Sequence, residues 1–89
     1  MGRIFGIIGI GDNSIKLTED FKYIFKDFLD IQEICILADD SNNFNKKYDN
    51  FICCTYDKKY AKSILSSHNL NYGKDYLWDE DYFPLLLRQ

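Results

Sequence analysis

Apolar residues run almost without interruption from Ile4 to Ile10, and the run closes on the polar turn Gly11-Asp12-Asn13-Ser14. A run of this length, rich in isoleucine and closed by Gly and Asn, is typical of a strand covered on both faces. The pattern therefore predicts a buried strand over residues 3–10 that leads through a glycine-bearing turn into a helix.

Two later stretches show helical spacing. In the first, Phe21, Ile24, Phe25, Phe28 and Leu29 recur at intervals of three and four, with charged residues between them. Thr18 is expected to cap this helix, because the acidic residues 19 and 20 then fall in its first turn, where the helix dipole favours negative charge. The second helix is predicted from Asp57 to about Asn69, with Thr55 or Asp57 as its cap. Its expected inward stripe is Tyr60, Ala61, Ile64, Leu65 and His68.

Three more apolar runs predict strands over residues 33–38, 50–55 and 75–78, and a short helix with Pro84 in its first turn is expected at the end. The element order is β-α-β-loop-β-α-β, and parallel strands require right-handed crossovers. The gap between the second and third strands is too short for a helix, so the chain is expected to cross to the other side of the first strand. This predicts a parallel sheet in the order 2-1-3-4.

Four short motifs follow one another in this order: Ile7-Ile8-Gly9-Ile10-Gly11, Ile36-Leu37-Ala38-Asp39-Asp40, Tyr48-Asp49-Asn50-Phe51-Ile52-Cys53-Cys54 and Gly73-Lys74-Asp75-Tyr76-Leu77. The pattern resembles the small Rossmann-like, NAD(P)-binding-like domains attached to bacterial sugar-modifying enzymes, sugar O-acyltransferases and radical-SAM proteins. It implies one reduced α/β domain over residues 1–89, a three-layer fold with a parallel sheet of three or four strands and two main helices. This chain lacks the further strand and helix that the family usually has before Tyr-Asp.

Gly9-x-Gly11-x-x-Ser14 is a partial dinucleotide fingerprint, in which glycines permit a tight turn and the following helix N-terminus attracts phosphate. We therefore predict that Gly9, Gly11, Asp12 and Asn13 bind the phosphate of a nucleotide or nucleotide-sugar. The alternative is a strand-to-helix turn that needs glycine only for its backbone conformation. Ser14 stands where the fingerprint has glycine or alanine, and a helix that began only at Thr18 would start late for a phosphate turn.

Asp39 and Asp40 end the second strand, where a carboxylate can bind a ribose hydroxyl. Their offset from the glycines is longer than the usual spacing of about 20 residues. The alternative is an Asx turn that ends the strand in solvent.

The amino-acid composition limits the classes of molecule that this chain is expected to bind. The net charge of −3 argues against a nucleic-acid partner, which needs clustered Lys and Arg. The three cysteines lie in strand-like runs without metal-type spacing, so we expect reduced, buried thiols, no metal site and a cytoplasmic location. Neither a signal peptide nor a run of about 20 apolar residues is recognisable, and no membrane association is expected.

Catalysis has little support in the sequence. His68, the single histidine, falls near a helix end, and the acidic run 79–81 suits a solvated loop better than a metal or acid–base site. The first functional hypothesis is a nucleotide or nucleotide-sugar binding module without its own catalysis. The second is a protein-interaction or dimerisation domain that keeps the fold and has lost the ligand. A small enzyme comes third.

The end of the chain predicts a partner protein. Tyr82, Phe83 and the leucines at 85–87 follow one another closely, and the second strand is apolar and lies at the predicted sheet edge. Together they give more apolar surface than so short a chain can bury. We expect a homodimer, or docking onto a larger enzyme.

Overall fold

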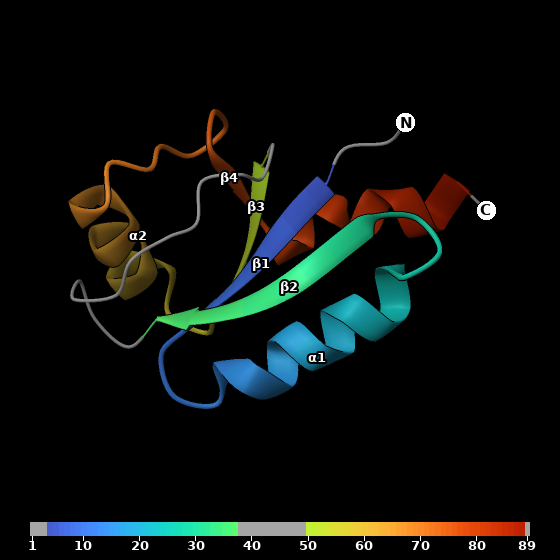
Figure 1. Ribbon diagram of the computed structural model, residues 1–89, viewed down its shortest axis with the longest axis horizontal. Helices are drawn as coiled ribbons and strands as arrows, with labels where there is room; N and C mark the ends of the chain where they lie inside the picture. The colour runs from blue at the N-terminus through green and yellow to red at the C-terminus, as the bar shows by residue number, and fades with distance from the viewer. Residues whose placement is uncertain (1–3, 38–49, 89) are drawn as a thin grey trace.

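The computed structural model describes residues 4–37 and 50–88, which form one parallel four-stranded sheet with helices packed on it (Figure 1). The strand order is β2-β1-β3-β4, which confirms the predicted topology and fold class. The elements are β1 (Ile4–Ile10), α1 (Ser14–Phe25), β2 (Asp30–Leu37), β3 (Asn50–Cys54), α2 (Lys58–Ser67), β4 (Tyr76–Trp78) and the 3-10 helix η1 (Asp79–Arg88).

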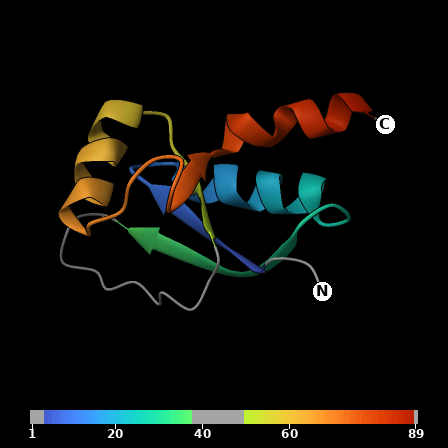
Figure 2. The same ribbon diagram turned by 90° about the horizontal axis from the view of Figure 1, so that it is seen from above.

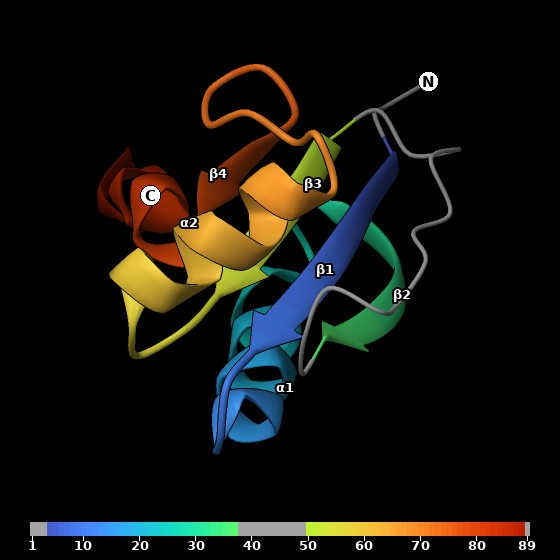
Figure 3. The same ribbon diagram turned by 90° about the vertical axis from the view of Figure 1, so that its left-hand side faces the viewer.

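The sheet is the middle of three layers. Helix α2 covers one face, and α1 and η1 lie side by side on the other (Figures 2 and 3). None of the helices in the described part of the chain is long and apolar enough to cross a membrane. The layering follows from the parallel connections, which place their helices on the faces of the sheet.

Strand β1 is buried on both faces, as its continuous apolar run predicts. Ile8 and Ile10 pack in the cluster beneath α2, whereas Phe5 and Ile7 pack in the cluster beneath α1 and η1. This alternation is the period of two that a strand imposes on its side chains. Because β2 pairs with one side of β1 and β3 with the other, β1 joins every layer of the molecule.

Helix η1 is fixed to the sheet by aromatic contacts. Tyr82 meets Phe5 and Phe21 edge-on, with ring centroids 6.0 and 5.8 Å apart, and Phe25 stacks on Phe83 at 6.2 Å. Such pairs add to the free energy gained by burial alone. Pro84, expected in the first turn, instead lies inside η1.

The predicted start of the first helix is wrong. Helix α1 begins at Ser14, with Asn13 as its N-cap residue, and Thr18 lies within the helix instead of capping it. The Thr18 side chain is fully buried, and its hydroxyl donates to the carbonyl of Ile15 over 2.7 Å. The chain reverses direction earlier than the capping pattern suggested, because Gly11 and Asn13 both adopt positive φ.

The predicted inward stripe of α1 is also partly wrong. Its buried residues are Ser14, Thr18, Phe21 and Phe25, while Ile24 keeps 47% of its surface exposed. The helix ends at Phe25, so Phe28 falls beyond it and stays 40% exposed.

The buried stripe of α2 agrees with its prediction better than that of α1 does. Ala61, Ile64 and Leu65 are buried as expected, but Tyr60 lies exposed. Both helices bury only the stripe that faces the sheet, which leaves apolar side chains on their flanks.

Helix α1 approaches the sheet closely at one position, above Gly9. A Cβ atom at Gly9 would lie 2.9 Å from Ser14 Oγ and 3.0 Å from Thr18 Cγ2. Both distances are shorter than ordinary van der Waals contact, so a side chain at Gly9 would force Ser14 or Thr18 to move. The small residues of α1 and the glycine of β1 therefore set the distance between helix and sheet.

We expect Gly9→Ala to lower the free energy of unfolding by about 1–3 kcal/mol, because the added methyl overpacks this contact. Ser14→Gly in the same chain removes the nearest atoms, so the double variant is expected to lose less than the sum of the two single losses. Urea unfolding of the four chains measures this coupling. Strictly additive losses would contradict the assigned contact.

Candidate functional site

The turn between β1 and α1 presents its backbone to solvent. Gly11 has φ +93° and Asn13 has φ +66°, and the Ser14 amide donates to the Gly11 carbonyl over 3.3 Å. Gly11, Asp12 and Asn13 are exposed, and no described residue other than the chain neighbours of Gly11 lies within 4 Å of a Cβ built there. A ligand can therefore approach the main chain of this turn closely.

The N-terminus of α1 opens directly from this turn. No side chain of the described residues caps it, and its first turn contains no acidic residue. The first amides of a helix lack intrahelical acceptors and carry the positive end of the helix dipole. The Lys16 ammonium lies in the same turn, and its pKa is raised by a 2.6 Å hydrogen bond to Asp20. The turn thus offers unsatisfied donors to an anion.

The loop that follows β3 is held against the end of β1. The Thr55 hydroxyl donates to the Ile10 carbonyl over 2.9 Å and accepts the Asp57 amide at 3.1 Å. Asp57 in turn accepts the Tyr60 amide at 3.0 Å, which confirms a cap for α2 in this loop. Tyr56, between them, keeps 71% of its surface exposed. Tyr56 makes a small electrostatic contribution to the raised pKa of Lys16, after the larger one from Asp20, so this loop lies near the first turn of α1.

These two loops leave the sheet at its topological switch point. Strands β1 and β3 are neighbours, with Gly9 paired to Cys54, although β2 comes between them in the chain. In open α/β sheets, ligands bind outside the carboxyl ends of the strands at such a point. Of the four predicted phosphate-turn residues, Gly11, Asp12 and Asn13 lie exposed at this edge, while Gly9 is buried within β1.

The predicted ribose carboxylates, Asp39 and Asp40, lie outside the described residues. The backbone of β2 leads toward the same edge, because Leu37 pairs with Ile10 at the end of β1. A ribose contact from this segment remains a prediction.

The acidic run after β4 is engaged in hydrogen bonds and an ion pair. Asp81 accepts the Trp78 amide at 2.9 Å and the Tyr72 hydroxyl at 2.7 Å, and Glu80 forms an ion pair with Lys58. Burial raises the pKa of Asp79. The described residues contain no group of three or more His, Cys, Asp or Glu placed to hold a metal ion. These acids connect β4 and η1 to the neighbouring elements.

The remaining chemical groups are remote or inert. His68 is the C-cap of α2, and its backbone amide donates to the Leu65 carbonyl over 3.1 Å. The Cys53 and Cys54 thiols are free and fully buried. Burial raises the pKa of Cys53 to about 12 and also raises the pKa of Cys54. Both groups therefore stay protonated and weakly nucleophilic at neutral pH.

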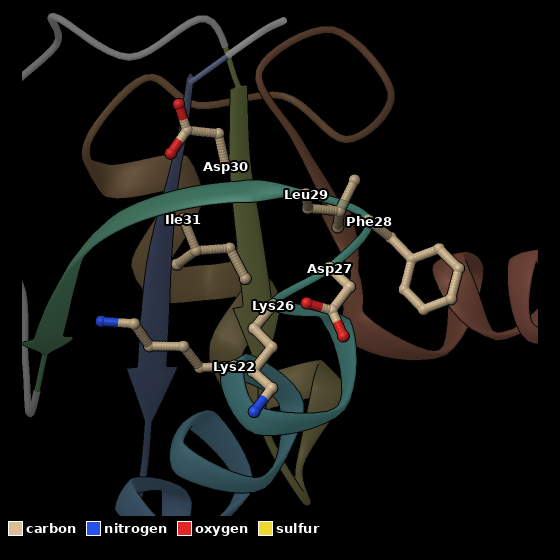
Figure 4. Close-up of a pocket in the computed structure, with 7 residues that line it drawn as sticks. All are labelled: Lys22, Lys26, Asp27, Phe28, Leu29, Asp30 and Ile31. Atoms are coloured by element: carbon tan, nitrogen blue, oxygen red, sulfur yellow. The ribbon is translucent and has the colours of Figure 1, made fainter.

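Two hollows lie away from the turn. The first, of about 380 Å³, is an open depression at the end of α1 and the start of β2 (Figure 4). Its lining residues are Lys22, Lys26, Asp27, Phe28, Leu29, Asp30 and Ile31. The second is an apolar groove of about 550 Å³ between α1 and η1. The closely spaced apolar residues 82–87 had indicated apolar surface at the groove in the sequence. The depression is lined by residues of several types, on the end of a helix and the turn after it, which form no recognisable motif.

Comparisons of this chain with protein-family models, with curated proteins and with solved structures find no match. The resemblance to Rossmann-like domains of sugar-modifying enzymes therefore remains an expectation drawn from the four motifs. The parallel sheet in the order 2-1-3-4, with helices on both faces, is compatible with a small Rossmann-like fold.

We expect Cys53 and Cys54 to resist alkylation by iodoacetamide at about pH 8 in the folded protein, because burial keeps both thiols protonated and inaccessible. In urea, both should react at the rate of a free thiol. Peptide mapping by mass spectrometry distinguishes them from Cys35. Rapid labelling of either residue without unfolding would contradict the buried placement.

Proposed function

We propose that this protein binds a nucleotide or nucleotide-sugar at the Gly11–Ser14 turn and does not transform it. The observation that carries the proposal is the early start of α1. Its first turn follows Gly11 after only two residues, so the open backbone of the turn and the N-terminus of the helix face the same space. This is the arrangement in which a helix N-terminus binds phosphate.

The N-terminus of α1 favours a phosphate ester over a free cation. The amides at the start of α1 are donors, and the dipole stabilises a nearby negative charge by about 0.3–1 kcal/mol at an exposed site. The turn also lies at the switch point between β1 and β3, where ligands of open α/β sheets bind. Asp39 and Asp40 are the proposed acceptors for the ribose hydroxyls.

The groups near the turn suit binding better than chemistry. Thr55 already donates its hydroxyl to a backbone carbonyl, and Asp57 is occupied in capping α2. The described thiols are protonated and buried, and His68 ends α2 at the far side of that helix. We therefore propose a binding module without its own catalysis.

The second candidate is an interaction or dimerisation domain that keeps this fold without a ligand. Ser14 in place of glycine and the shortened middle of the chain favour it, as does the exposed apolar groove between α1 and η1. The two candidates predict opposite outcomes in a ligand screen.

We expect one member of a panel of NAD, NADP, nucleotide-sugars, S-adenosylmethionine and coenzyme A to raise the melting temperature. A ligand that binds only the folded chain stabilises it by about 2.7 kcal/mol at a concentration 100 times its Kd. The absence of any shift at millimolar ligand would favour the second candidate.

The binding site is tested by Asn13→Asp. Aspartate tolerates the positive φ of this position and places a negative charge at the N-terminus of α1, where it competes with phosphate. We expect the unfolding free energy to rise by about 0.3–1 kcal/mol while ligand affinity, measured by calorimetry, falls by about tenfold or more. Loss of affinity without loss of stability separates a site effect from misfolding.

The matched control is Asn69→Asp. Asn69 is also exposed, has φ +62°, and follows α2 at its C-terminal end, so the same substitution meets the opposite end of a helix dipole. We expect slightly lower stability and unchanged ligand affinity. Equal effects of the two substitutions on affinity would contradict a site at the β1–α1 turn.

A further inference from the structure

The surface between α1 and η1 is apolar and exposed. Its groove is lined by Ile24 from α1 and by Phe83, Pro84, Leu86 and Leu87 from η1, with Glu80 at one end. Phe83 is 45% exposed and Leu87 is 87% exposed. An isolated exposed leucine is ordinary, but adjoining apolar side chains on two helices indicate a surface that is covered in function.

Phe28 extends this surface past the end of α1. Its ring lies 6.1 Å from that of Phe25, which stacks on Phe83, so one aromatic row connects the turn after α1 to the middle of η1. Ile24, Phe28, Phe83 and Leu87 form what we call the groove patch. From their exposed fractions, and areas of about 200 Å² per large apolar side chain, the patch presents roughly 400 Å² of apolar surface.

The apolar area of the groove patch is comparable to the apolar area that each subunit of a homodimer buries. A standard interface buries about 800 Å² on each partner, and about 65% of a homodimer interface is apolar. The groove patch alone supplies most of that apolar share. It also lies within the roughly 300–600 Å² that the largest apolar patch of a monomer covers, a size that is often functional.

The charges beside the groove favour a second copy of this chain as the partner. Glu80 is neutralised by Lys58, and Asp20, one helical turn before Ile24, is neutralised by Lys16. A two-fold axis brings the same surface of both copies together, so charges left unpaired at its border would repel their own images. Here Glu80 and Asp20 are paired within the chain.

We propose that the groove patch is the interface of a symmetric homodimer, formed by α1 and η1 of each copy. Helices α1 and η1 lie side by side (Figure 2). Two copies related by a two-fold axis would therefore bring four helices into contact and place the exposed Leu87 of each copy against the other's groove. The interface lies on a helix-covered face and leaves the β1–α1 turn open. Dimerisation therefore does not depend on ligand binding.

The test is molar mass in solution, measured by light scattering and sedimentation at tens of micromolar. The wild-type chain is expected at twice its monomer mass. Ile24→Glu and Leu87→Glu should each yield a monomer, with the dissociation constant raised at least about tenfold, because each buries a charge in the apolar patch. Leu87 is almost fully exposed, so its substitution leaves the folded monomer intact.

Ile15→Glu is the matched control. Ile15 is on the same helix, is about as exposed as Ile24 and lies outside the groove, so this variant should remain dimeric. A monomeric wild-type chain would overturn the proposal, and it would do so even if the groove turned out to bind a different protein. A dimer that survives both groove substitutions would overturn it as well, and circular dichroism of each variant shows that the fold is retained.

Discussion

The close contact between α1 and β1 at Gly9 is the constraint on which the other features depend. Ser14 and Thr18 occupy the volume that any side chain at Gly9 would need. The connection from β1 to α1 turns within three residues, and Gly11 and Asn13 adopt positive φ in it. The exposed turn and the uncapped helix N-terminus lie directly beside this contact.

Helix α1 contributes residues to two different surfaces. Its N-terminal turn lies at the carboxyl edge of the sheet and is polar and uncapped, whereas its later residues border the apolar groove beside η1. Tyr82 anchors η1 against Phe5 and Phe21, and this contact leaves Phe83 and Leu87 on the outer side. A phosphate ligand and a second protein chain would therefore occupy separate regions of the molecule.

The sequence was sufficient for the topology because the decisive signals are local. The run from Ile4 to Ile10 identified a strand buried on both faces, and the short gap before β3 identified the change of side that gives the order 2-1-3-4. The cap of α2 was also visible, since Asp57 precedes a helical pattern directly. The helix start at Thr18 was wrong because Thr-Glu-Asp imitates a capping sequence, while Thr18 is in fact buried within α1, against Gly9 of β1.

Sequence pattern alone was enough to assign the strands and helices, the strand order and the surplus apolar surface near the end of the chain, because period, turn chemistry and crossover rules act over short distances. Where α1 begins and which face of it is buried became visible only in the folded structure. The folded structure also brings Ile24 together with Phe83 and Leu87 in one groove. The start of α1 depends on the contact of Gly9 with Ser14 and Thr18. The groove depends on the docking of η1, in which Tyr82 packs against Phe5 and Phe21, residues far from it in the chain.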